Sequence, residues 1–199
     1  MFIKPPFNML VSGMTGCGKT HYILDLLETE FKNKFDYIFI ICPSFDYNKT
    51  YNRKWIHKDE CIFLLVIDKD LNKTLEKLIE QYKDEEEQTL IIIDDCANLH
   101  DAKLKATNLT KLAFHGRHYN ISTWVLTQKY NAIIKDFRQN IQHLVLFYDK
   151  DKESREASFK QNDIGITGEE KKDIIKKLKS SNSKLVMCLF PPFEWDLLE

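Results

Sequence analysis

Paired cysteines, clustered arginines and long apolar runs are all missing from this chain of 199 residues. The five cysteines form no CxxC pair and are odd in number, which predicts reduced thiols in an intracellular protein. The longest clean apolar run near the middle covers residues 62–67, far short of the roughly 20 residues that a membrane helix needs. Pro5 and Pro6 interrupt the first ten residues before an apolar core forms, so we expect no signal peptide and no membrane partner.

A charge excess is missing as well, because 29 Lys and Arg offset 30 Asp and Glu to a net charge of −1. This balance excludes a globally basic nucleic-acid binder, but it does not exclude a locally basic face. The residues are 43% hydrophobic and 30% charged, which is typical of a globular protein and excludes disorder for most of the chain. The length favours one domain that needs no disulfide or metal to be stable.

Short apolar runs alternate along the chain with segments of helical spacing. The runs do not alternate with polar residues, as is typical of parallel strands with both faces covered. They cover residues 7–12, 37–42, 62–67, 90–94, 121–127, 144–148 and 185–190. Apolar stripes at helical spacing lie in residues 71–82, 109–113 and 130–137, and residues 20–31 are compatible with a helix. This order predicts an α/β domain with a central, mostly parallel sheet.

Residues 13–20 match the phosphate-binding (Walker A) pattern G-x-x-x-x-G-K-[ST], between a predicted strand and a predicted helix. Glycines let the backbone curl so that N–H groups face a phosphate, and the helix adds its positive N-terminal end. Lys19 supplies a charge to the β- and γ-phosphates, and the Thr20 hydroxyl can bind Mg²⁺. The predicted nucleotide-binding residues are Gly13, Met14, Thr15, Gly16, Cys17, Gly18, Lys19, Thr20 and His21.

Two carboxylates, Asp94 and Asp95, end the apolar run of residues 90–93. This is the Walker B form, in which Asp94 would hold the water shell of Mg²⁺ and Asp95 would be the general base for the attacking water. A helix N-cap followed by a loop acid is the alternative interpretation. The next apolar run ends in Gln128. We expect this amide to be a polar sensor beside the γ-phosphate, provided that an added strand separates the Walker A and Walker B strands.

Residues 114–128 read FHGRHYNISTWVLTQ. Together with GMTGCGKT and LIIIDD, this segment resembles the genome-packaging ATPases of the FtsK–HerA superfamily, in the form found in poxviruses, other large DNA viruses, virophages and polinton-like elements. The resemblance covers about residues 7–148. It implies a three-layer RecA-like P-loop NTPase fold and an arginine that acts at the ATP site. We carry that role onto Arg117, in its own subunit or in a neighbouring one.

The same resemblance implies a motor that hydrolyses ATP and translocates double-stranded DNA, packaging a viral genome into a capsid. We expect residues 1–199 to form a single P-loop ATPase domain, with a core over about 7–148 and C-terminal helices and a final strand over 149–199. The expected cofactors are ATP and Mg²⁺. The expected partners are double-stranded DNA bound without sequence specificity, further copies of the chain in a homo-oligomeric ring, and capsid proteins. The expected location is the host cytoplasm, a viral factory or the virion.

The predicted site therefore comprises four catalytic residues and two metal ligands. The catalytic set is Lys19, Asp95, Gln128 and Arg117, and the metal ligands are Thr20 and Asp94. Two alternatives differ in class from a motor. A P-loop nucleoside or nucleotide kinase usually has an Arg-rich lid, whereas the four arginines here are scattered singly. A non-catalytic nucleotide switch would not need the paired carboxylates and the glutamine that position a water.

Three segments have a local composition suited to DNA, although a solvated face is the alternative for each. Residues 103–118 carry four cations and no acid, and residues 169–184 carry six lysines against three acids. Residues 47–55 interleave aromatic and basic side chains, a mixture that suits backbone contact with stacking. The aromatic segment 190–195 can either pack on the core or stack on adenine, and we favour packing.

Overall fold

One sheet of eight strands organises the part of the chain that the computed structural model describes, which is residues 2–65, 70–96, 107–181 and 183–199. The strand order is β3-β2-β4-β5-β1-β6-β7-β8. The first six strands in this order are mutually parallel, whereas β7 is antiparallel to β6 and β8 is antiparallel to β7. The strands are β1 (Asn8–Ser12), β2 (Tyr37–Ile41), β3 (Ile62–Leu65), β4 (Thr89–Asp94), β5 (Ile121–Thr127), β6 (His143–Leu146), β7 (Lys184–Cys188) and β8 (Glu194–Leu198).

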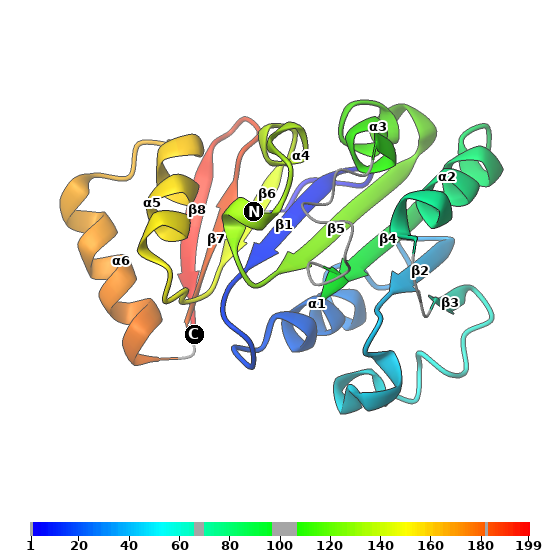
Figure 1. Cartoon of the computed structure of the whole chain (residues 1–199), viewed down its shortest axis with the longest axis horizontal. Coiled ribbons are helices and arrows are strands. Elements are labelled where there is room, and N and C mark those ends of the chain that lie inside the picture. Colours follow the sequence, from blue (N-terminus) through cyan, green and yellow to red (C-terminus); the bar gives the residue numbers. More distant parts are fainter. Residues whose placement is uncertain (1, 66–69, 97–106, 182) are drawn as a thin grey trace.

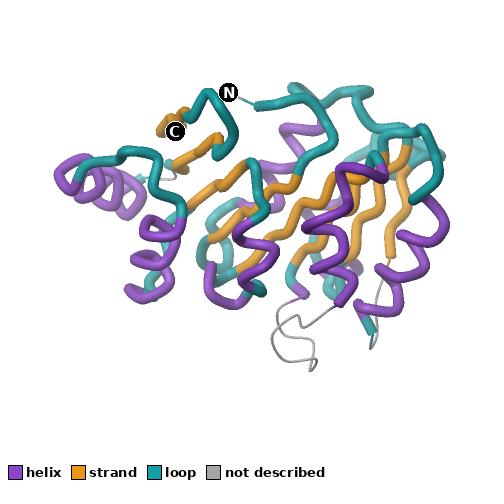
Figure 2. The backbone as a smooth tube through the Cα atoms, turned by 90° about the horizontal axis from the view of Figure 1, so that it is seen from above, coloured by secondary structure: helices purple, strands orange, loops and turns teal. Residues whose placement is uncertain are grey.

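Helices cover both faces of this sheet, as Figures 1 and 2 show. One face carries α1 (Lys19–Glu28) and the segment between β2 and β3, which contains the 3₁₀ helices η1 (Phe45–Tyr47) and η2 (Lys49–Tyr51). The other face carries α2 (Leu71–Tyr82), α3 (Thr107–His115), α4 (Lys135–Gln139), α5 (Lys152–Gln161) and α6 (Gly168–Ser180). The predicted three-layer α/β fold with a mostly parallel central sheet is confirmed.

The side chains of β4 show why the apolar runs do not alternate with polar residues. Leu90 and Ile92 pack in the core on the α1 face, whereas Ile91 and Ile93 pack in the core on the opposite face, and all four are buried. A strand covered on both sides needs apolar residues at every position. β5 lies between β1 and β4, so the Walker A and Walker B strands are separated by one added strand, as predicted.

Three details of the sequence prediction are corrected by the structure. The stripe over 130–137 is not one helix, because Ile133 and Ile134 are extended between the 3₁₀ helix η5 (Tyr130–Ala132) and α4. The run 185–190 forms β7, which is antiparallel although its reading was that of a parallel strand. Side chains on both faces of β7 are buried, so its apolar run indicates burial and does not indicate the direction of the strand. β8 was not predicted, and residues 66–67 of the third run lie outside the described residues.

Candidate nucleotide-binding and hydrolysis site

The Walker A loop connects the end of β1 to the start of α1. Gly16 and Gly18 have φ values of +76° and +95°, a left-handed conformation that favours glycine, and no atom lies within 4 Å of a Cβ built on either residue. Gly13 was predicted to allow the backbone to curl, but the structure requires glycine there for close packing. A Cβ at Gly13 would stand 2.5 Å from the Cβ of Phe147, so close packing demands glycine there. The Lys19 Nζ donates to the carbonyl oxygens of Gly13 (2.7 Å) and Met14 (3.0 Å) and lies inside the loop.

The predicted metal ligands lie next to each other. The Thr20 Oγ1 donates to the Asp94 Oδ2 over 2.8 Å, and the Tyr51 hydroxyl donates to the same oxygen over 2.7 Å. Asp94 is buried, and this burial raises the pKa of the carboxyl group, while the two hydrogen bonds oppose that rise. Oxygen ligands beside a cavity are what Mg²⁺ prefers, so Thr20 and Asp94 fit this cation.

The second carboxylate and the glutamine are also brought together. Asp95 has φ +54°, a conformation that is uncommon outside glycine and often found at functional sites. The Gln128 Nε2 donates to the Asp95 Oδ1 over 3.1 Å. These residues follow neighbouring parallel strands, β4 and β5, whose carboxyl ends meet at one edge of the sheet. The geometry therefore places a potential base and a potential sensor side by side.

A cavity of about 320 Å³ opens in front of these side chains. Its lining combines the phosphate loop with the ends of β4 and β5 and with two residues of the segment between β2 and β3. The residues are Thr15, Gly16, Gly18, Lys19, Thr20, His21, Asn48, Thr50, Asp94, Asp95, Leu126, Thr127 and Gln128. The volume and the loop suit a nucleoside triphosphate. Asn48 and Thr50 at this cavity and Tyr51 at Asp94 were not predicted from the sequence, because no motif marks a loop residue that reaches a site only through the fold.

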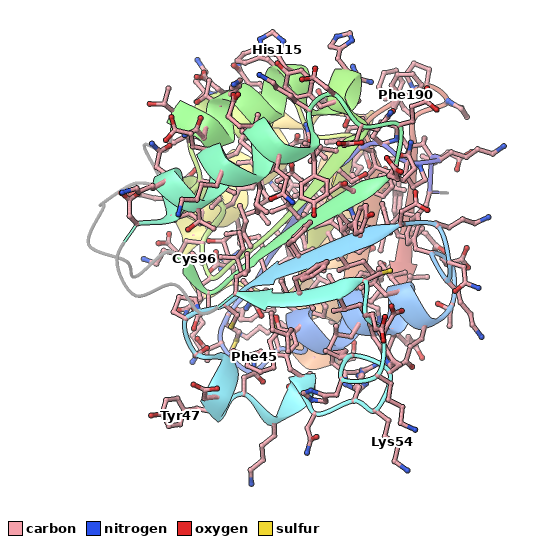
Figure 3. All side chains as sticks on the ribbon, turned by 90° about the vertical axis from the view of Figure 1, so that its right-hand side faces the viewer. Phe45, Tyr47, Lys54, Cys96, His115 and Phe190 are labelled. Carbon is pink, nitrogen blue, oxygen red and sulfur yellow. The ribbon has the colours of Figure 1, made fainter. Side chains whose placement is uncertain are left out.

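Two residues of the predicted DNA segment 47–55 are taken up by polar contacts within the chain. Tyr51 is buried against Asp94, and Arg53 forms ion pairs with Asp25 (2.8 Å) and Glu28 (2.9 Å) of α1. Tyr47 is exposed, and Figure 3 shows it pointing away from the protein. Part of this segment therefore fastens the wall of the cavity to α1, so Tyr51 and Arg53 are not available to DNA, whereas Tyr47, Lys49 and Lys54 are exposed.

Arg117 lies away from the residues that it was predicted to join. It belongs to η4 (Gly116–Tyr119), just before the start of β5, whereas Gln128 follows the end of β5. Seven residues of strand separate the two ends, a distance of roughly 23 Å. Arg117 is exposed, and the cavity lining within the described residues contains no arginine. The site of one chain is thus not completed by its own Arg117.

The remaining predicted segments differ in exposure. Lys103 and Lys105 lie outside the described residues. On α6, Lys172, Lys176 and Lys179 are all exposed, and their spacing puts them on one face of the helix. Phe190 and Phe193 are exposed between β7 and β8, and Figure 3 shows Phe190 far from Cys96, which follows the Walker B pair. The expected packing of this aromatic segment on the core is confirmed for Trp195 and is wrong for Phe190 and Phe193.

No helix in the described ranges is both long enough and apolar enough to span a membrane.

Known proteins resemble the chain in sequence. Residues 1–188 match the family described as "Poxvirus A32 protein". The monkeypox virus protein named "DNA packaging protein OPG160" is 30% identical over 154 residues, which cover 73% of this chain and 49% of that protein. The protein of the same name from vaccinia virus (strain Copenhagen) is also 30% identical, with coverages of 73% and 54%. The chain therefore spans about half the length of these relatives.

Solved structures resemble the chain in fold. B204, described as the DNA-packaging ATPase from Sulfolobus Turreted Icosahedral Virus, has a TM-score of 0.71 at 14% identity and covers 99% of this chain and 98% of its own. The genome packaging NTPase B204 from Sulfolobus turreted icosahedral virus 2, in complex with AMPPCP, has a TM-score of 0.66 at 17% identity, with 99% of each chain covered. At these identities the likeness shows a common fold.

Proposed function

The chain belongs to the Poxvirus A32 protein family, and from this premise we propose that it is an ATP-hydrolysing motor that moves double-stranded DNA into a capsid. The observation that carries the proposal is the convergence of Thr20, Asp94, Asp95 and Gln128 on one cavity behind a phosphate loop. These groups suit the activation of water rather than the binding of a second substrate. The names of the poxvirus relatives and of B204 support DNA as the cargo.

The side chains of the cavity divide the proposed reaction between them. The phosphate loop and Lys19 bind the triphosphate, and the lysine would exchange its carbonyl partners in the loop for phosphate oxygens. Thr20 and Asp94 would hold Mg²⁺, which neutralises the charge that develops on the phosphates. Asp95 orients a water and accepts its proton, and Gln128 keeps that carboxylate in place through its amide.

An arginine from a second copy of the chain is part of this proposal. Arg117 lies at the opposite edge of the sheet from the cavity of its own chain, so in this proposal it acts at the site of a neighbouring subunit. A ring of identical subunits would present the Arg117 of each subunit to the cavity of the next one. Hydrolysis would then depend on the interface, which is the coupling that a ring-shaped motor requires.

The exposed lysines of α6 are the proposed contact with DNA. Lys172, Lys176 and Lys179 share one face, while Ile174 and Leu178 on the other side of the helix are buried. The C-terminal end of α6 lies close to the phosphate loop, because Lys179 and Gly16 line a common small cavity. Phosphate contacts by lysine carry no sequence information, which fits a motor that must accept any sequence. Capsid proteins complete the proposed set of partners, and the proposed location is the infected cell or the virion.

The experiment that tests the function is the rate of ATP hydrolysis with and without linear double-stranded DNA, at low and at moderate salt. We expect stimulation by DNA that weakens as salt rises, because lysine–phosphate contacts release counterions. Lys19→Ala should abolish hydrolysis at both salt concentrations. A chain that transfers phosphate only when a nucleoside or nucleotide is added would be a kinase, and the proposal would be wrong.

The same assay tests the DNA surface. A variant with Lys172→Gln, Lys176→Gln and Lys179→Gln should lose most of the stimulation by DNA. The slope of its DNA affinity against salt concentration should decrease by the amount that about three phosphate contacts contribute. A control with Lys32→Gln, Lys34→Gln and Lys58→Gln removes the same charge from exposed positions outside α6, in the connections between α1 and β2 and between β2 and β3, and should keep the stimulation. Equal stimulation of the two triple variants would exclude α6 as the DNA contact.

A further inference from the structure

Tyr51 reaches the predicted Mg²⁺ site although it belongs to neither Walker motif. It ends η2, in the segment between β2 and β3, and the residue is 1% exposed. The ring packs beside Phe45, with 5.2 Å between the ring centroids, in the core on the α1 face. Its hydroxyl is therefore enclosed by protein, and the partner that it finds there is the Asp94 carboxylate, at 2.7 Å.

Two hydroxyl groups converge on a single oxygen of Asp94. The Oδ2 accepts from Tyr51 at 2.7 Å and from Thr20 at 2.8 Å. Within the described residues, no side chain donates to the Oδ1, and Asp94 lines the nucleotide cavity. Two fixed donors on Oδ2 set the plane of the carboxylate. They leave Oδ1 to accept from the water shell of the cation.

The segment that carries Tyr51 is also fastened to the helix that carries Thr20. Arg53, two residues after Tyr51, bridges Asp25 and Glu28 of α1, and its side chain is 15% exposed. The Trp55 indole N–H donates to Glu28 as well. These contacts hold the segment with Tyr51 against the helix with Thr20. The position of Tyr51 relative to Thr20 is therefore defined by several contacts rather than by one.

We infer that Tyr51 is a positioning residue for Mg²⁺, which holds the Asp94 carboxylate in the orientation that binds the cation and its water shell. The inference rests on the proposed ATPase function. Tyr51 does not touch the nucleotide in this assignment, so it should affect metal binding and leave metal-free nucleotide binding intact. Groups that orient a metal ligand in this way typically contribute about 10–100-fold to metal affinity.

The test compares two tyrosine-to-phenylalanine variants of the full chain. Tyr51→Phe removes the hydroxyl from Asp94 and keeps the ring. Tyr22→Phe removes a hydroxyl that is also buried on the α1 face but has no hydrogen-bond partner within the described residues. The probe is Mn²⁺ in the presence of ADP, followed by electron paramagnetic resonance, which reports metal binding without turnover. Binding of ADP without metal is measured alongside.

We expect Tyr51→Phe to weaken Mn²⁺ binding to the ADP complex about tenfold, with metal-free ADP affinity unchanged. Tyr22→Phe should leave both affinities at the wild-type level. In the background of Asp94→Asn, Tyr51→Phe should cause no further loss, because the carboxylate through which it acts is gone. Equal Mn²⁺ affinities for wild type, Tyr51→Phe and Tyr22→Phe would overturn the inference.

A second variant decides the matter if Tyr51→Phe does not fold. Arg53→Gln releases the same segment from α1 at a partly exposed position and leaves Tyr51 in place. It should weaken Mn²⁺ binding about threefold, and an unchanged affinity would contradict the inference. A wild-type chain that binds no ADP in the presence of Mn²⁺ would instead contradict the proposed function. The two failures are therefore distinguishable.

Discussion

The two edges of the parallel sheet have different chemistry. At the carboxyl edge, four polar residues from three separate motifs meet around one cavity, namely Thr20, Asp94, Asp95 and Gln128. At the amino edge, Arg117 is exposed and His143 is buried between the rings of Phe2 and Phe7. A parallel sheet thus brings side chains distant in sequence together only when each of them follows a strand. A residue that precedes a strand is carried to the other side of the domain.

This comparison separates the groups that act within one subunit from those that need a second one. The carboxyl edge holds the phosphate loop, the proposed metal ligands and the proposed base with the amide that contacts it, all in one chain. The proposed arginine finger lies at the amino edge, about one strand length away. The predictions below test this division, beginning with the largest effect.

Arg117→Ala should lower the rate of ATP hydrolysis about 10³–10⁵-fold, which is the contribution of an arginine that stabilises the transferring phosphoryl group. Binding of ATP should stay within about twofold of wild type, because Arg117 is remote from the cavity of its own chain. Arg117→Lys should recover only part of the rate, since lysine lacks the planar fork. The measurements are steady-state hydrolysis and equilibrium nucleotide binding. His118→Ala, at the next exposed position, is the control and should hydrolyse ATP at the wild-type rate. Full activity of Arg117→Ala would refute the assignment of Arg117 to the ATP site.

Asp95→Asn should lower hydrolysis about 10²–10⁴-fold with little change in nucleotide affinity, because the base is lost while the phosphate loop is intact. Asn is a suitable replacement, since it tolerates the left-handed conformation that Asp95 adopts. Gln128→Ala should have a smaller effect in the same direction, because it removes the support of the carboxylate rather than the carboxylate itself. Single-turnover hydrolysis with a parallel binding measurement distinguishes the variants. Unchanged turnover in Asp95→Asn would show that another group activates the water.

Acidification should destabilise the folded chain through a buried histidine at the amino edge. Burial lowers the pKa of His143 to about 4, from the usual histidine value of 6.5. Between these values the unfolded chain binds more protons than the folded chain, so the free energy of unfolding decreases as pH falls. The loss between pH 7 and pH 5 should be about 2 kcal/mol.

Urea unfolding at the two pH values measures this loss, and His143→Gln serves as the comparison, because glutamine does not titrate. The difference between wild type and His143→Gln isolates the histidine from the other acids and from the exposed histidines. If both chains lose the same stability on acidification, His143 is not the group responsible.

Much of the fold could be predicted from sequence, because parallel strands that are buried on both faces have continuous apolar runs. The residues 90–93 and 121–127 are apolar or small throughout, and each lies in the predicted strand. β8 has no such run, because Glu194 and Asp196 alternate with Trp195 and Leu197 on a sheet edge that is only partly covered. The direction of β7 was not predictable either, because burial from both faces is independent of strand direction.

The site was predictable where a motif dictates backbone geometry and unpredictable where tertiary packing delivers a side chain. Gly16, Gly18 and Lys19 follow from the phosphate-loop pattern. Tyr51 does not, since it lies in an irregular segment whose aromatic and basic composition suggested a DNA surface. Its contact with Asp94 depends on β2 and β4 being neighbours and on the turn that follows β2, and neither is encoded in the local sequence.

The most direct test of the account is ATP hydrolysis by an equimolar mixture of Lys19→Ala and Arg117→Ala in the presence of double-stranded DNA. Each variant alone should be almost inactive, because one lacks a working cavity and the other lacks the arginine. In the mixture, the intact cavity of Arg117→Ala can face the intact Arg117 of Lys19→Ala. We therefore predict that mixing restores hydrolysis. The recovered rate should be proportional to the fraction of interfaces at which the cavity of Arg117→Ala faces a Lys19→Ala subunit. A mixture as inactive as its components would contradict a site shared between subunits.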